Sequence, residues 1–105
     1  MHRSYATEIA LDIRPLGIPL STTGQLERWL VKQGDRVQAG SALARLSLGS
    51  RSYELRLQYS GKVDLIQTAP GERIYPGIAL VQILSESKPL SDGARLVLLD
   101  ANQLG

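Results

Sequence analysis

An internal repeat at a constant offset of 37 residues constrains the fold of this 105-residue chain more than any other feature. Segments 24–46 and 61–83 match, glycine on glycine, acid on acid and aliphatic residue on aliphatic residue. The matched pairs are Gly24 with Gly61, Gly34 with Gly71, Asp35 with Glu72, Arg36 with Arg73, Val37 with Ile74, Gly40 with Gly77, Ala42 with Ala79, Leu43 with Leu80 and Leu46 with Ile83. Two copies are too few for a solenoid, so we predict two interlocking halves related by a pseudo-twofold axis.

Each copy of the repeat has the pattern of an all-β unit. A strand-like segment leads into a turn of glycine and an acid, and a second glycine precedes another strand rich in aliphatic residues. Strict alternation of apolar and polar residues fails over 26–29 and, in the same way, over 63–66, which predicts a β-bulge or sharp bend in each half. The glycines at 34, 40, 71 and 77 are expected at turns that need a positive φ.

The segment between the two copies reads as a tight hairpin with Gly49-Ser50 at its tip. Alternation on both sides fixes a register in which Ser47 lies opposite Ser52, Leu46 opposite Tyr53 and Arg45 opposite Glu54. An apolar pair and an opposite-charge pair then fall on opposite faces, as a half-buried hairpin requires.

The flanking segments predict one strand on each side of the repeat. Residues 6–13 alternate well enough for a first strand, which the proline-containing segment 15–19 ends, and residues 1–5 are expected to be flexible. Residues 85–93 read as a loop or linker, and 94–105 as an extra strand over 94–99 followed by a tail. An unpaired strand at 94–99 would be an exposed edge, through which a homodimer could form.

Composition sets the class of protein and excludes several kinds of partner. The length suits one domain, and with 5% aromatic residues and no Phe the core must be aliphatic. The net charge of +2 comes from scattered Lys and Arg without a basic run, so we expect no nucleic-acid partner. The absence of Cys suits the cytoplasm, and charges at Glu8, Asp12 and Arg14 interrupt any signal or membrane segment.

No constellation of residues predicts catalysis or a metal site. His2 is the single histidine, and the serines have no base in the body of the chain. Asp35 and Glu72 are matched turn residues rather than an acid/base pair, and Trp29 is expected in the core because Ile66 is its repeat partner. We therefore expect no enzymatic activity and no bound metal.

Residues 6–84 resemble the biotinyl/lipoyl attachment domain family. The resemblance is closest to lipoyl domains of the acyltransferase component of 2-oxo acid dehydrogenase complexes. It rests on three stretches, which are Ala6-Thr7-Glu8-Ile9, Trp29-Leu30-Val31-Lys32-Gln33-Gly34-Asp35-Arg36-Val37 and Ser60-Gly61-Lys62-Val63. The resemblance implies a flattened β-barrel, or barrel-sandwich hybrid, of two four-stranded sheets with quasi-twofold symmetry.

Modified members of the family present a lysine at a hairpin tip, within a D-K-A or M-K-M motif, and carry lipoate or biotin on it. Family spacing puts Ser50 at the lysine position, with Gly49 before it and Arg51 after it. The attachment needs an amine, which neither a hydroxyl nor a guanidinium that stays protonated supplies. The resemblance therefore implies the scaffold without lipoate or biotin, acting in protein interaction or assembly, for example with a component of a dehydrogenase or carboxylase complex.

Two alternatives remain open on the sequence alone. The first is a carrier domain of an acyltransferase or carboxylase complex whose lysine has been replaced or has moved to Lys62. Lys32 and Lys88 are the other lysines, and none of the three is expected at a hairpin tip. The second is a relative of the lipoyl-like domains of efflux adaptor proteins. Those usually hold a long helical hairpin between the two halves, whereas only residues 47–60 intervene here, and this short connection counts against the second alternative.

Overall fold

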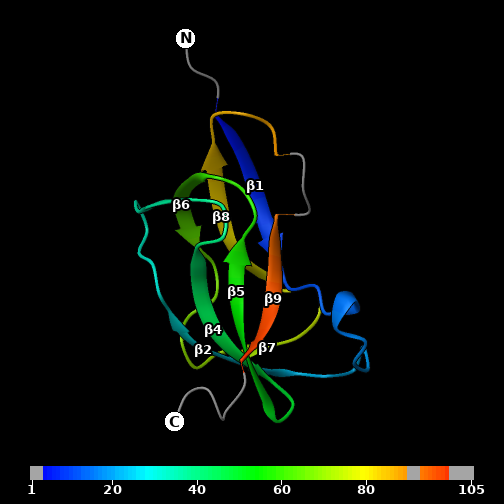
Figure 1. The fold of residues 1–105 in the computed structure, drawn as a ribbon. Helices are drawn as coiled ribbons and strands as arrows, with labels where there is room; N and C mark the ends of the chain where they lie inside the picture. The colour runs from blue at the N-terminus through cyan, green and yellow to red at the C-terminus, as the bar shows by residue number, and fades with distance from the viewer. Residues whose placement is uncertain (1–3, 90–92, 100–105) are drawn as a thin grey trace.

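Residues 4–89 and 93–99, which the computed structural model describes, form nine β-strands and one short 3₁₀ helix (Figure 1). This result confirms the predicted all-β class. The elements are β1 (Tyr5–Ala10), η1 (Arg14–Leu16), β2 (Gly24–Trp29), β3 (Arg36–Val37), β4 (Ala42–Leu48), β5 (Arg51–Leu57), β6 (Gly61–Ile66), β7 (Arg73–Ile74), β8 (Ala79–Ser85) and β9 (Ala94–Leu99). No helix in the described part of the chain is long and apolar enough to cross a membrane.

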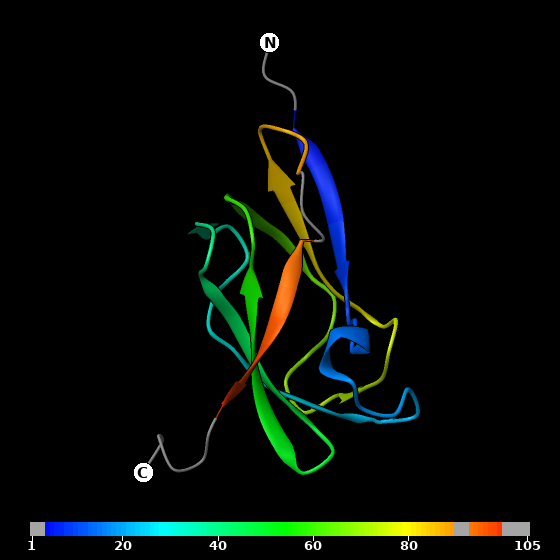
Figure 2. The same ribbon diagram turned by 45° about the vertical axis from the view of Figure 1, so that its right-hand side comes forward.

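The strands form two antiparallel sheets that face each other across the core (Figures 1 and 2). One sheet has the order β1-β8-β6-β3, and the other has the order β7-β2-β4-β5-β9. Without β9 each sheet would have four strands, as the family resemblance implies. The fifth strand is the predicted strand over 94–99, which pairs with β5 along its whole length.

The repeat offset of 37 residues is reproduced by the strand boundaries. β2, β3 and β4 begin and end 37 residues before β6, β7 and β8, respectively. Strands β5 and β1 complete the two halves, since β5 pairs with β4 as β1 pairs with β8. Each sheet takes one short strand from the other half, because β3 pairs with β6 and β7 pairs with β2. The predicted interlocking of the halves is therefore confirmed.

The bulges predicted in β2 and β6 hold the two halves together. The pairing register shifts between Leu26 and Arg28 and between Val63 and Leu65. At the first bulge, Gly71 N donates to Leu26 O at 2.7 Å and Leu26 N donates to Glu72 O at 3.0 Å. Val63 makes the equivalent bonds with the turn at residues 34–35. Each irregular strand thus satisfies its backbone groups on the turn of the other half.

The core between the sheets is aliphatic apart from one tyrosine, as the composition predicts. Its fully buried members come from both copies of the repeat, and Leu26 and Val63, Leu43 and Leu80, and Leu46 and Ile83 occupy equivalent places. Burial of such side chains stabilises a fold by about 2 kcal/mol each. The pseudo-symmetric core is therefore what fixes the orientation of the hairpins at its ends.

The chain ends differ in detail from the predicted boundaries. β1 begins at Tyr5 and ends at Ala10, and Leu11 and Ile13 stay buried without continuing the strand. Leu11 instead exchanges backbone hydrogen bonds with Gly77 and Ile78. Of the remaining predicted segments, residues 1–3, 90–92 and 100–105 lie outside the described residues.

Candidate functional site

The tip of the β4–β5 hairpin lies at the end of the molecule opposite the start of β1 (Figures 1 and 2). Leu48 pairs with Arg51, which leaves Gly49 and Ser50 as the two-residue turn. Gly49 has a φ of 62°, in the left-handed region that favours glycine. Its N–H donates to Thr23 O at 3.1 Å. The predicted tip residues Gly49, Ser50 and Arg51 are all exposed, so the turn is held by backbone and open to a partner.

The stem of the hairpin has the predicted register. Ser47 pairs with Ser52, Leu46 with Tyr53 and Arg45 with Glu54. Leu46 and Tyr53 are buried, whereas the Ser52 hydroxyl donates to Glu27 Oε1 at 3.3 Å on the outer face. The stem of the hairpin therefore has a polar outer face, and its inner face is packed in the core.

The side chains at the tip offer a hydroxyl and a guanidinium, and none of the three lysines of the sequence is among them. Lys32 lies between β2 and β3, Lys62 is the second residue of β6, and Lys88 follows β8. An amide to the ε-amino group of a lysine cannot form at Ser50. The residues at the tip thus do not fit covalent lipoate or biotin.

The acids of the repeat turns have a structural role in both halves. Asp35 Oδ2 accepts a hydrogen bond from Lys32 N at 2.9 Å, and Glu72 Oε1 accepts the equivalent bond from Ala69 N at 3.1 Å. The two carboxylates therefore close equivalent turns, as the sequence predicts. Among the described residues no group of three or more His, Cys, Asp and Glu could hold a metal ion. His2 lies outside those residues.

Two ionisable groups outside the hairpin have displaced pKa values. The hydrogen bond from the Arg14 side chain, with a second from the Arg14 backbone, lowers the pKa of Asp12. Burial of the Tyr59 ring raises the pKa of its hydroxyl, which has no hydrogen-bond partner in the described structure. Both groups serve the scaffold rather than the tip.

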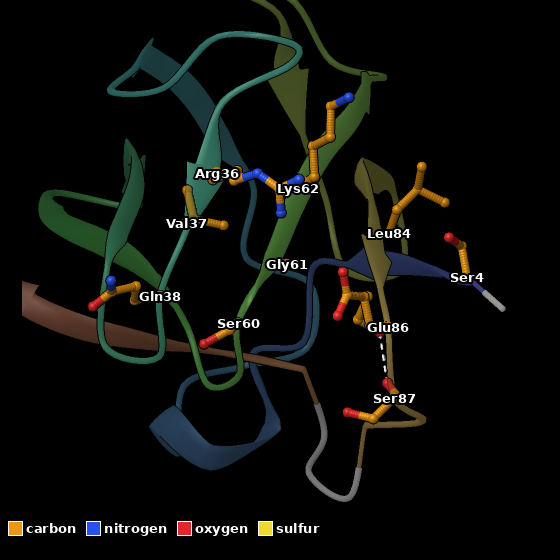
Figure 3. Close-up of a pocket in the computed structure, with 11 residues that line it drawn as sticks. Ser4, Arg36, Val37, Gln38, Ser60, Gly61, Lys62, Leu84, Glu86 and Ser87 are labelled. Carbon is orange, nitrogen blue, oxygen red and sulfur yellow. Dashed lines mark hydrogen bonds between the residues drawn. The ribbon is translucent and has the colours of Figure 1, made fainter. Parts of the chain in front are cut away.

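A cavity of about 620 Å³ lies beside β3, β6 and the end of β8, a place that the sequence did not indicate (Figure 3). Arg36 and Lys62 line it from directly paired positions on β3 and β6, and Glu86 lines it from the segment after β8. The other lining residues are Ser4, Val37, Gln38, Ser60, Gly61, Leu84, Ser85 and Ser87. Only the cross-half pairing of β3 with β6 brings Arg36 and Lys62 together, so no local sequence pattern could reveal the cavity.

Comparison with known proteins connects this fold to a family of carrier domains. A family model described as "Biotin-requiring enzyme" matches residues 17–83, which include both copies of the repeat and the hairpin. The lipoamide acyltransferase component of the branched-chain alpha-keto acid dehydrogenase complex of Arabidopsis thaliana is 30% identical over 100 residues, covering 86% of this chain and 21% of that protein. The dihydrolipoyllysine-residue acetyltransferase component of the pyruvate dehydrogenase complex of Rickettsia felis is 30% identical over 74 residues, covering 70% of this chain and 18% of that protein. The chain thus spans about a fifth of the length of these relatives.

Proposed function

The chain belongs to the biotinyl/lipoyl domain family and is related to acyltransferase components of 2-oxo acid dehydrogenase complexes, and from this premise we propose that it is a non-catalytic module for protein interaction or assembly. It carries no lipoyl or biotinyl group. Its partner is a protein, in the first place a component of a dehydrogenase complex, rather than a nucleic acid or a membrane. It acts in the cytoplasm.

One observation supports this proposal above all, and it is Ser50 at the tip of an otherwise intact hairpin. Carrier members of the family hold their group as an amide on a lysine, because the ε-amino group is the nucleophile that is acylated. Ser50 has no amine, and the neighbouring Arg51 keeps a protonated guanidinium. The scaffold that presents a prosthetic group is thus retained at a tip without its acceptor, which favours recognition over group transfer.

Intact-mass spectrometry tests the absence of modification. The protein is expressed with lipoate and biotin ligases and their substrates, and we expect the unmodified mass. The matched variant is S50K, which restores an amine at the tip, and a gain of one lipoyl or biotinyl group in this variant alone would show that only the acceptor is missing. A gain of one such group by the wild-type protein would contradict the proposal.

The alternative is a carrier domain modified at a displaced lysine. The repeat offset places Lys88 at the counterpart of Arg51, directly after the counterpart of the hairpin tip, and this correspondence is the observation that favours Lys88 over Lys32 and Lys62. Peptide mapping of any modified protein distinguishes the three. A lipoyl group on one lysine, lost in its Lys→Arg variant, would establish the alternative.

Self-association through β9 is a second component of the proposal. β9 uses one edge to pair with β5, and it is the last strand of its sheet. The side chain of Leu98 on this strand is 47% exposed. Sedimentation velocity should show a dimer that L98K converts to a monomer, because a lysine on an edge strand opposes pairing of edges. A monomer at all concentrations of wild-type protein would contradict self-association through β9.

A further inference from the structure

Four arginines gather on the outer face of the five-stranded sheet. The register places Arg28 of β2 opposite Arg45 of β4, and Arg56 of β5 opposite Arg95 of β9. Residues directly opposite each other on antiparallel strands share a face, and Glu54 lies between the two pairs because it is opposite Arg45 and two residues from Arg56. We call the surface formed by Arg28, Arg45, Arg56 and Arg95 the arginine face.

The arginine face holds more positive charge than its own acids neutralise. Glu54 serves two of the arginines, with Arg56 Nε at 2.9 Å from Oε1 and Arg45 Nε at 3.9 Å from Oε2. Arg45 Nε is buried without a hydrogen-bond acceptor in the described structure. Arg28 and Arg95 are exposed, and the ion pairs of residues 4–89 and 93–99 include neither. Like charges directly opposite each other destabilise a sheet, so this arrangement has a cost that the fold itself does not explain.

The pseudo-twofold axis supplies an internal comparison for this face. The positions equivalent to Arg28 and Arg45 on the other sheet, 37 residues later, are Leu65 and Gln82. Ala10 takes the place of Arg56, since Ala10 is opposite Ala79 as Arg56 is opposite Ala42.

The acids are retained in this comparison, whereas the arginines are not. Glu8, opposite Gln82, is the counterpart of Glu54, and Asp64 is the counterpart of Glu27. The same strand pattern therefore forms without arginines, and their presence on one sheet points to a role outside the fold.

We propose that the arginine face is a docking surface for an acidic segment of a protein partner. This inference rests on the proposed function as an interaction module, and it adds the surface and the charge of the partner. A guanidinium binds a carboxylate through two parallel hydrogen bonds, and the uncompensated Arg28 and Arg95 flank a centre already ordered by Glu54.

An acidic protein suits this surface better than a nucleic acid does. The outer-face residues of β2, β4, β5 and β9 include no aromatic ring on which a base could stack. Glu27 and Glu54 stand among the arginines and would repel a continuous phosphate backbone. Spaced carboxylates of a peptide can instead align with separate guanidinium groups.

Fluorescence anisotropy with a labelled oligoglutamate peptide tests the inference. The variant R28Q/R95Q removes the two arginines without an ion pair, and R14Q/R36Q removes the same charge from exposed arginines outside the face. We expect R28Q/R95Q to weaken peptide binding about tenfold, roughly threefold for each arginine, because an ion pair at an exposed position contributes less than a buried one. R14Q/R36Q should stay within about twofold of wild type, because charges distant from the bound peptide are largely screened by salt.

Several results would overturn the inference. Equal losses in the two double variants would mean attraction by net charge alone, and a DNA oligonucleotide of equal charge that binds more tightly than the peptide would assign the face to nucleic acid. Co-purification from host lysate tests the arginine face separately from the proposed function as an interaction module. If R28Q/R95Q and wild type retain the same amount of a dehydrogenase-complex component, the arginine face is not the docking surface, and the proposed function stands. If wild type retains no such component, the proposed function itself fails.

Discussion

Trp29 at the end of β2 donates a hydrogen bond from its indole Nε1 to the backbone carbonyl of Thr68, at 2.8 Å. The two residues belong to different halves of the repeat. Thr68 is 1% exposed, and its own hydroxyl donates to Ala79 O at 2.7 Å. The single tryptophan is thus packed against the core and also links the first half of the repeat to the loop between β6 and β7 in the second half.

Replacement of Trp29 by phenylalanine should lower the free energy of unfolding by about 1 to 2 kcal/mol. The smaller ring gives up part of the packing, and the Thr68 carbonyl loses its donor in a site with little access to water. Denaturant unfolding followed by circular dichroism measures the change, because the variant has no tryptophan fluorescence. A midpoint equal to that of wild type, at an unchanged m-value, would show that the link between the halves contributes nothing.

Gly24 and its repeat partner Gly61 lie where two backbones come too close for a side chain. A Cβ at Gly24 would overlap the Ser47 carbonyl oxygen and approach Leu48 Cα to 3.0 Å, and at Gly61 it would come within 2.6 Å of Leu84 O. We expect G24A to cost at least about 3 kcal/mol, because the neighbouring β4 backbone must move.

A matched control separates this overlap from backbone strain. Gly34 has a φ of 95°, and nothing lies within 4 Å of an added Cβ. G34A should therefore lower the free energy of unfolding by about 1 to 2 kcal/mol, which is the strain of a residue other than glycine in the left-handed region. Thermal or chemical unfolding of the two variants measures the difference. A smaller loss in G24A than in G34A would contradict the close approach.

The features of the fold that sequence analysis predicted correctly are those encoded locally or by the repeat. The register around Gly49-Ser50 follows from alternation on both sides of a two-residue turn, since a slip by one residue would expose Leu46 and Tyr53. The bulges follow from broken alternation at the same place in both copies. The offset of 37 residues, finally, predicts which pairs of core positions are equivalent.

The features that sequence analysis missed depend on pairings between distant segments. The sequence predicts the strand over 94–99 but not its place against β5, because alternation does not say which free sheet edge a later strand covers. The arginine face was missed for the same reason, since Arg95 reaches Arg56 only through that pairing. Whether the tip carries a group depends on chemistry at Ser50, and this remains a prediction.

The raised pKa of Tyr59 makes stability fall at alkaline pH. Burial of the ring disfavours the phenolate in the folded state, so the unfolded chain loses this proton first as the pH rises through about 10. Above that pH the unfolded state binds fewer protons, and the free energy of unfolding decreases until the folded state ionises as well. The stabilising contribution is fully present below pH 10 and is lost above it.

The variant Y59F should therefore unfold with a shallower dependence on pH above about 9.5 than wild type does. Tyr75, which is 51% exposed, provides the matched control for loss of a tyrosine hydroxyl through the variant Y75F. Urea midpoints between pH 8 and 11 measure both slopes. Identical slopes in Y59F and wild type would mean that Tyr59 titrates alike in the folded and unfolded chain.

Glu54 is the acid on which the centre of the arginine face depends. Its side chain is 11% exposed and pairs with Arg45 and Arg56. E54Q keeps the shape but leaves the two guanidinium groups without an opposing charge. We expect E54Q to lower the free energy of unfolding by about 1 to 2 kcal/mol. Breaking a fully buried ion pair costs more, roughly 3 to 5 kcal/mol. The cost is smaller here because the side chains of Arg45 and Arg56 are 33% and 38% exposed, so that water screens their charges.

The pseudo-symmetric variant E8Q is the matched control for Glu54. Glu8 is exposed and accepts a 3.2 Å hydrogen bond from Gln67 Nε2, and no ion pair of the described residues includes it. Its replacement should therefore change stability by less than about 0.5 kcal/mol. Denaturant unfolding of E54Q and E8Q side by side measures the contrast. Equal losses of stability in E54Q and E8Q would mean that the arginines around Glu54 gain nothing from its charge. A larger loss in E54Q would support the role of Glu54. If that loss becomes smaller when Arg45 or Arg56 is also changed to Gln, Glu54 is established as the acid that orders this surface.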